Sequence, residues 1–235
     1  MRQRKRVVTN SKSQMRLQER LAKKYCSLHH FIDVSGGPPQ KTAFGLFSIN
    51  RNSMNRVYKD FRKTFPRYVG KRAKASSLDE EELIKIIDFF NSNGIMMRAS
   101  CVENGDWLFY KRTYEHRKKY FEERIYGMIY CTILKTVSYR DYPYPVIMCK
   151  ERYLRRPETA LDICKEFSNY SGYHFSLSFG DRKVTDELRF ADFIAGSAFK
   201  INRKKLENFE NFHFIDIKLP RIYCLKAFNY HKSEI

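Results

Sequence analysis

The order of its apolar segments is the feature that most restricts the fold of this chain. Short apolar runs bounded by Gly, Pro or polar residues predict strands, and apolar residues at every third or fourth position predict helices. Predicted strands span 28–34, 41–49, 95–102, 144–150 and 173–179. Predicted helices span 50–65, 77–94, 111–137, 156–172 and 184–201. The order β-β-α-α-β-α-β-α-β-α predicts one α/β domain with a mixed sheet flanked by helices.

The two ends of the chain differ from this pattern. Residues 1–24 carry nine Lys/Arg and one Glu with few apolar residues, which predicts a basic N-terminal arm followed by a single domain over 25–235. Beyond residue 206, alternating apolar positions predict short strands or packing segments. No run of apolar residues approaches the length of a membrane span, and no apolar segment follows the first charges as in a secretory signal. We therefore expect a cytoplasmic protein with no membrane partner.

The charge balance points to a polyanionic partner. The chain has 45 Lys+Arg against 26 Asp+Glu, a formal net charge of +19. Nucleic acid is the commonest partner of such a protein, an acidic membrane surface is the rival, and an incidentally basic surface is the plain alternative. The residues expected to contact nucleic acid are Arg2, Arg4, Lys5, Arg6, Lys12, Arg16, Arg20, Lys23, Lys24, Lys71, Arg72 and Lys74.

Cysteine and histidine show no recognisable metal-binding motif. The six cysteines have neither a C-x-x-C nor a zinc-finger spacing, so they predict small core residues in a reducing compartment, without disulfides or structural zinc. Cys149, in "PVIMCK", is one of them. His29 and His30 are adjacent on a predicted strand and should point to opposite faces, which argues against a shared metal ion.

Three aspartates are the candidate catalytic residues. Asp33 ends the first predicted strand before a Gly-Gly-Pro-Pro turn, Asp181 follows the strand 173–179, and Asp192 interrupts an apolar helix. A buried carboxylate is costly unless it is hydrogen-bonded, paired or bound to a metal ion. We expect Asp33 and Asp192 to bind Mg²⁺, which accepts few carboxylates, several waters and phosphate oxygens. The alternative for Asp192 is a hydrogen bond within or at the end of its helix.

Two of these aspartates lie in stretches that resemble a known family. "FIDVSGG" is similar to an N-terminal motif hhhDESGD, and "LRFADFIAGSAFK" is similar to a C-terminal motif LQLADLIAGAIxR. Both belong to the domain-of-unknown-function family numbered thirty-eight hundred. The resemblance covers roughly residues 25–205 and implies an RNase H-like fold, nucleic-acid binding or nuclease activity, and acids that hold Mg²⁺ at the centre of the sheet. Asp33 and Asp192 match the motif aspartates, and Ser35 and Gly36 match the Ser-Gly.

The chain also departs from the family's pattern. Val34 stands at the motif glutamate, and Cys149 and Lys150 stand where a third sheet acid is expected, with Glu151 displaced. The stretch "KRAKASSL" resembles the family's "ElKaSkL" but lacks its acid. Loss of carboxylates weakens cation binding and favours binding phosphate without cutting it.

Three functions follow from these observations. The first is a nucleic-acid-binding RNase H-like protein with an eroded metal site, with RNA favoured over DNA and ribosomal RNA a plausible target. The second is an active Mg²⁺-dependent nuclease in which Asp33, Asp181 and Asp192 hold the ion and Glu151 or Asp186 completes the site. The third is a protein-interaction module with incidental positive charge. The oligomeric state stays open.

Overall fold

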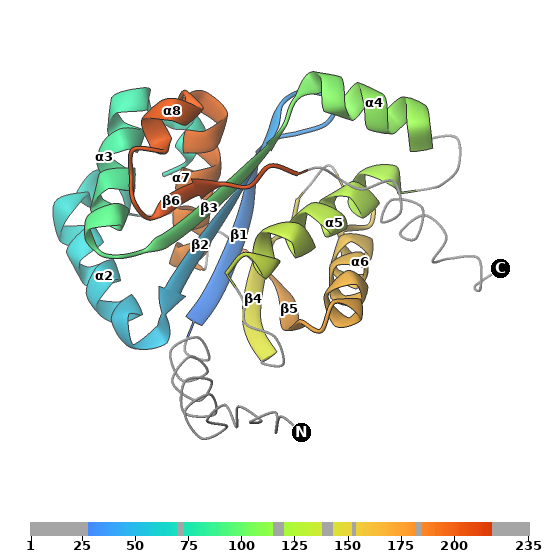
Figure 1. The fold of residues 1–235 in the computed structure, drawn as a ribbon. Helices are drawn as coiled ribbons and strands as arrows, with labels where there is room; N and C mark the ends of the chain where they lie inside the picture. The colour runs from blue at the N-terminus through green and yellow to red at the C-terminus, as the bar shows by residue number, and fades with distance from the viewer. Residues whose placement is uncertain are drawn as a thin grey trace, which may run out of the picture.

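A six-stranded mixed sheet runs through the protein in this computed structural model (Figure 1). The structure describes residues 28–69, 73–114, 120–137, 143–151, 154–181 and 185–217. Its strands are β1 (Leu28–Gly36), β2 (Thr42–Asn50), β3 (Met96–Val102), β4 (Pro143–Cys149), β5 (His174–Gly180) and β6 (Phe212–Phe214). They lie in the order β5-β4-β1-β2-β3-β6. β2 pairs antiparallel with β1 and β3, whereas β4 is parallel to β1 and β5 is parallel to β4, so the predicted mixed sheet is confirmed.

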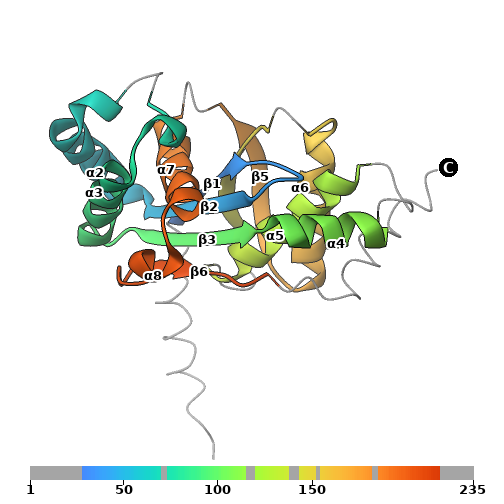
Figure 2. The same ribbon diagram turned by 90° about the horizontal axis from the view of Figure 1, so that it is seen from above.

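Helices cover both faces of the sheet. They are α2 (Arg51–Thr64), α3 (Glu80–Ser92), α4 (Asn104–Tyr114), α5 (Phe121–Lys135), α6 (Pro157–Tyr170), α7 (Asp186–Lys200) and α8 (Arg203–Leu206), with short 3₁₀ turns η1 (Pro66–Tyr68) and η2 (Ala75–Ser77). Helices α2, α3 and α7 lie on one face, and α5 and α6 lie on the other (Figures 1 and 2). Within the described segments, no helix is both long enough and apolar enough to cross a membrane.

The alternation of side chains along β1 decides which face each residue serves. Phe31 packs in the core on the α7 side, whereas Ile32 and Val34 pack in the core on the α5 and α6 side. Because successive side chains of a strand point to opposite faces, Asp33 shares the α7 face with Phe31. The fold therefore turns the first candidate aspartate toward the helix that carries Asp192.

Helix α7 lies unusually close to the sheet at Gly45. Gly45 is the β2 partner of Asp33 in the antiparallel register. A Cβ atom at Gly45 would lie 2.3 Å from the Ala195 backbone nitrogen and 2.6 Å from the Ala191 carbonyl oxygen. Only glycine admits this approach, because both opposing atoms belong to the helix backbone. Gly45 thus allows α7 to pack directly over the β1–β2 pair.

Two details of the predicted helices are wrong. The predicted helix over 111–137 is two helices, α4 and α5, and α4 already begins at Asn104. Tyr120 has a left-handed φ of 62° immediately before α5, a conformation that no α-helix can contain. The predicted helix over 77–94 begins only at Glu80, and its N-cap is Asp79, which accepts the Glu82 N–H and forms a capping box with it.

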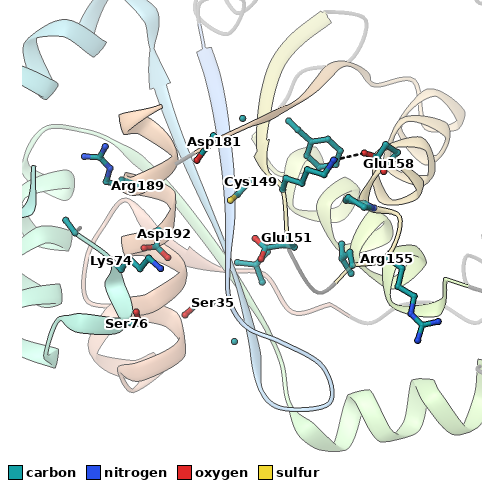
Figure 3. Close-up of a pocket in the computed structure, with 18 residues that line it drawn as sticks. Ser35, Lys74, Ser76, Cys149, Glu151, Arg155, Glu158, Asp181, Arg189 and Asp192 are labelled. Carbon is teal, nitrogen blue, oxygen red and sulfur yellow. Dashed lines mark hydrogen bonds and ion pairs between the residues drawn. The ribbon is translucent and has the colours of Figure 1, made fainter. Parts of the chain in front are cut away.

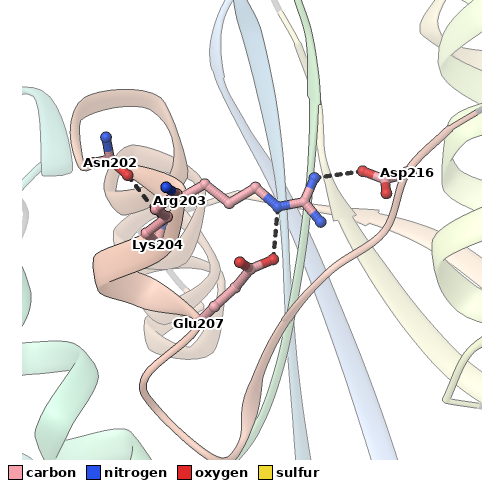
Figure 4. Close-up of polar contacts among 5 residues, drawn as sticks. All are labelled: Asn202, Arg203, Lys204, Glu207 and Asp216. Atoms are coloured by element: carbon pink, nitrogen blue, oxygen red, sulfur yellow. Dashed lines mark hydrogen bonds and ion pairs between the residues drawn. The ribbon is translucent and has the colours of Figure 1, made fainter.

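An ion-pair network ties the segment after β6 to α8 (Figure 4). The Asn202 side chain accepts the Lys204 N–H at 2.9 Å and caps α8. Arg203 donates from Nε to Glu207 at 2.6 Å and from a terminal nitrogen to Asp216 at 2.5 Å. These two hydrogen-bonded carboxylates raise the pKa of Arg203 above its ordinary value.

Several predictions lie outside the described residues. They include the basic arm over 1–24, the cations Lys71 and Arg72, and the alternating segment over 222–228. Each of them stays a prediction.

Candidate functional site

A cleft of about 970 Å³ opens at the carboxyl ends of β1, β4 and β5 (Figure 3). The parallel registers place Ile32 beside Met148, and Cys149 beside Gly180, so the three strands end at the same edge of the sheet. In open α/β sheets, ligands bind outside the carboxyl ends of the strands. The position of the cleft is therefore the one where a ligand of this fold is expected.

The cleft is lined by side chains of both charges. Its basic residues are Lys74, Lys150, Arg155 and Arg189, and its acidic residues are Glu151, Glu158, Asp181 and Asp192. Figure 3 shows Lys74 and Asp192 on the α7 side, Arg155 and Glu158 on the α6 side, and Cys149 and Glu151 between them. A lining with both charges suits a ligand whose anionic groups lie next to the basic side chains and whose associated cations lie next to the acidic ones.

Three buried donors converge next to the cleft, and two of them, Cys149 and Glu151, line it. Ligand atoms of Asp33, Cys149 and Glu151 all lie within 4.8 Å of one another. Asp33 is 0% exposed, Cys149 6% and Glu151 3%. Asp33 follows Ile32 and Cys149 follows Met148 in neighbouring parallel strands, so the two donors come next to one another on the α7 face.

Glu151 occupies the place where sequence reasoning found an acid missing. The prediction took Cys149 and Lys150 as the residues at this position and treated Glu151 as displaced from it. Glu151 lies two residues beyond Cys149, the last residue of β4, and a chain that continued extended past the strand would point both side chains to the same side. That two-residue spacing was readable from the sequence and is a signal for placing Glu151 beside Cys149, whereas its proximity to Asp33 depends on the pairing of β1 with β4.

Val34 does not remove a donor from this cluster. Its side chain is 3% exposed and packs in the core on the α5 and α6 side, opposite to the face of Asp33. The substitution of the motif glutamate by valine therefore alters the apolar core rather than the set of buried donors.

Asp192 attaches the segment around Ala75, which forms one wall of the cleft, to α7. Its Oδ2 atom accepts the Ala75 N–H at 2.9 Å, and Lys200 of the same helix donates to the carbonyl oxygens of Ala75, Ser76 and Leu78 at 3.1, 2.9 and 2.7 Å. A Cβ atom at Gly196, between them, would lie 2.2 Å from the Ala75 Cβ atom. These contacts join the segment resembling "ElKaSkL" to the helix that carries the C-terminal motif.

The two remaining candidate acids take separate positions. Asp181 is exposed and lines the cleft after β5. Asp186, at the start of α7, forms an ion pair of 2.8 Å with Arg189. Among the described residues, Asp181, Asp186 and Asp192 do not belong to the group formed by Asp33, Cys149 and Glu151.

One partly buried and one exposed polar contact also fix the opposite wall. Glu123 of α5 is 2% exposed and accepts the Arg156 N–H at 3.0 Å, which anchors the loop that carries Arg155. Lys150 pairs with Glu158 of α6 at 3.0 Å. The cleft is thus shaped by contacts from α5, α6 and α7 before any ligand is considered.

His30 contributes no charge to this region. Complete burial, with a smaller effect from His29, lowers the pKa of His30 to about 3. Its Nδ1 atom is 2.8 Å from the Ser48 hydroxyl oxygen. His30 is therefore a neutral core residue across the physiological range.

The donor cluster fits a divalent cation. Two buried carboxylates are costly to keep charged in a low-dielectric interior, and a cation between them offsets that cost. Carboxylate oxygens suit Mg²⁺ and Mn²⁺, and a thiol adds a softer donor. Cys149 and Glu151 line the cleft, where solvent or a ligand could complete the coordination.

Similarity to solved structures identifies the fold class of this chain. The chain is similar to the ribonuclease H2 from Pyrococcus horikoshii OT3, with a TM-score of 0.51 and 12% identity, over 78% of this chain and 77% of that one. The chain has an RNase H-like fold. It also aligns with Bst-RNase HIII in complex with Mn²⁺, with a TM-score of 0.49 and 12% identity, over 80% of this chain and 56% of that one. No protein-family model matches the sequence, and no curated protein matches it.

Proposed function

We propose that this protein binds nucleic acid in the cleft and cleaves it with a divalent cation held by Asp33 and Glu151. The observation that carries this proposal is the convergence of buried Asp33, Cys149 and Glu151 beside a cleft whose lining includes four basic side chains. The fold shared with ribonuclease H2 is consistent with it. A bound divalent cation would polarise a phosphoryl oxygen and favour ionisation of an attacking water.

The remaining residues of the cleft would bind and orient the phosphodiester chain. Lys74 and Arg155 lie on opposite walls, where each can contact phosphate oxygens on either side of the buried acids (Figure 3). Asp192 fixes the wall that carries Lys74, so its role here is to position that cation. Asp181 is an exposed carboxylate at the rim and is suited to accept a proton from a bound water.

The nucleic-acid partner is supported by charge. The net charge of +19 favours a polyanion over a small neutral substrate. RNA remains our favoured substrate over DNA, and association with ribosomal RNA, the basic arm and a cytoplasmic location remain predictions from the sequence.

Binding without cleavage is the second candidate function. It is favoured by one observation, namely that the Asp192 carboxylate is committed to the Ala75 N–H and lies outside the group of convergent donors. A site with fewer carboxylates around the cation would bind phosphate while cutting it slowly or not at all.

A cleavage assay separates these functions. Full-length protein is incubated with end-labelled single-stranded RNA, RNA–DNA hybrid and duplex DNA, with Mg²⁺, with Mn²⁺ or with a chelator. We expect metal-dependent products that fall by about a hundredfold or more in Asp33→Asn and Glu151→Gln, because second-sphere changes alone cost about 10–100-fold. Asp88→Asn, which changes an exposed acid of α3 outside the cleft, should keep its activity.

Two outcomes of the same experiment would reject the proposal. Salt-sensitive binding without products under any metal would establish the binding function instead. Absence of binding to all three nucleic acids would favour the protein-interaction module.

A further inference from the structure

Cys149 is the unusual member of the donor cluster. It is the last residue of β4, it is 6% exposed, and its sulfur lies within 4.8 Å of carboxylate oxygens of Asp33 and Glu151. Two carboxylates alone would make a site of hard oxygen donors. The thiol places one soft donor among them.

The other described cysteines have different surroundings. Cys131 and Cys164 lie between α5 and α6, where Ser168 donates to the Cys131 sulfur at 3.4 Å and where Cys164 hydrogen-bonds Cys131 and lowers its pKa to about 7. Cys101 on β3 donates to the Ala198 carbonyl oxygen at 3.4 Å. Of the cysteines that the structure describes, Cys149 is the one in a group of potential metal ligands.

Ligand softness then distinguishes between metal ions. Mg²⁺ prefers octahedral oxygen coordination and keeps several waters, so a sulfur donor adds little to its affinity. Zn²⁺ and Co²⁺ accept thiolate, carboxylate and water together, and a catalytic zinc site has three protein ligands with one position left open. The cluster has three such donors, two of which line the cleft.

We infer that Cys149 makes this site select a thiophilic divalent cation, Zn²⁺ or Co²⁺, over Mg²⁺. The inference rests on the cation site of the proposed function and replaces the Mg²⁺ expected from the sequence as its preferred ion. The affinity of the site for Mn²⁺, which prefers oxygen ligands, should lie between its affinity for Zn²⁺ or Co²⁺ and its affinity for Mg²⁺.

Cobalt spectroscopy tests this inference directly. Full-length protein is stripped with a chelator, kept reduced with a phosphine rather than a thiol, and titrated with Co²⁺. We expect a thiolate-to-cobalt charge-transfer absorption in the near ultraviolet that is present in the wild type and in Cys101→Ser and absent in Cys149→Ser. A Cys26→Ser, Cys224→Ser double variant should keep the band, which excludes the two cysteines outside the described residues.

Calorimetric titrations with Zn²⁺, Mn²⁺ and Mg²⁺ measure the selectivity. The wild type should bind Zn²⁺ at least about a hundredfold more tightly than Mg²⁺, and Cys149→Ser should reduce that ratio at least about tenfold, mainly through weaker Zn²⁺ binding. Cys149→Asp should instead strengthen Mg²⁺ binding, because it restores a set of three carboxylates. Circular dichroism of each variant confirms that it is folded.

The outcomes are distinguishable. The inference fails if Zn²⁺ and Mg²⁺ bind equally well, or if Co²⁺ binds without the charge-transfer band. In either case the proposed cation site survives, provided that the ions that bind the wild type no longer bind Asp33→Asn. If no ion binds to the folded wild type, or if Asp33→Asn leaves every affinity unchanged, the metal-dependent function fails with it.

Discussion

At the scale of single residues, Asp192 combines a structural hydrogen bond with a position in the lining of the cleft. Its carboxylate accepts the Ala75 N–H, while the same residue lines the cleft. A ligand of the cation must keep its negative charge, whereas a positioning residue needs only an oxygen that accepts a hydrogen bond. Substitutions that separate charge from hydrogen bonding therefore decide between the two roles.

We predict that Asp192→Asn keeps the hydrogen bond that attaches the Ala75 segment to α7 and that Asp192→Ala loses it. Asparagine still offers an oxygen to the Ala75 N–H, whereas alanine leaves that buried donor unsatisfied at a cost of about 1–3 kcal/mol. Urea unfolding should show this loss for alanine alone, and nucleic-acid affinity should follow the same order. A metal affinity that falls equally in both variants, with asparagine stability intact, would show instead that Asp192 binds the cation.

The residues of the site were only partly predictable from the sequence. Asp33 was identified because it ends an apolar strand before a turn, a local signal. Glu151 was not placed beside it, because adjacency of the two depends on the pairing of β1 with β4, which no local pattern encodes. The burial of Cys149 was predicted, but its position between two carboxylates requires the same long-range pairing.

At the scale of elements, the close packing of α7 on the sheet depends on Gly45. We predict that Gly45→Ala lowers the free energy of unfolding by about 1–3 kcal/mol or more, because the new methyl group would collide with backbone atoms of α7. Gly105→Ala is the matched control, since a Cβ atom there meets nothing within 4 Å, and its stability should be unchanged or slightly higher. Denaturant unfolding of both variants measures the difference. Equal stabilities would mean that α7 shifts away from β2 at little cost.

The elements themselves were predicted better than their limits. Strands and most helices follow from periodicity within short windows, which is why their order was readable. The division between α4 and α5 was missed because both segments share a helical spacing, whereas Tyr120, immediately before α5, has a left-handed backbone. Backbone conformation of this kind is set by tertiary packing rather than by the period of apolar residues.

At the scale of the whole molecule, the excess of positive charge should govern affinity. We predict that the logarithm of the nucleic-acid binding constant falls linearly with the logarithm of salt concentration. Deletion of residues 1–24, which carry nine Lys/Arg, should make this slope shallower, by about 0.7 for each lost contact to a single strand and about 0.9 for a duplex. Fluorescence anisotropy over a salt series measures the slope.

A control with one cation removed elsewhere completes this experiment. Lys85→Ala removes an exposed lysine of α3 that does not line the cleft, and it should leave the slope nearly unchanged. A slope that is the same with and without the arm would identify residues 1–24 as a solvated tail.

The donors lie on β1, at the last residue of β4 and just after β4, and these positions have a consequence for the folding of the chain. All of the chain from β2 to α5 lies between these two strands in sequence, so they meet only after most of the protein has been synthesised and has closed a long loop. A nascent or misfolded copy therefore has no assembled cluster. Any ion that binds the assembled cluster, but not the unfolded chain, in turn stabilises the native state by mass action. Folding is therefore a precondition for assembly of the donor cluster, and ion binding to the cluster would add to the free energy of unfolding.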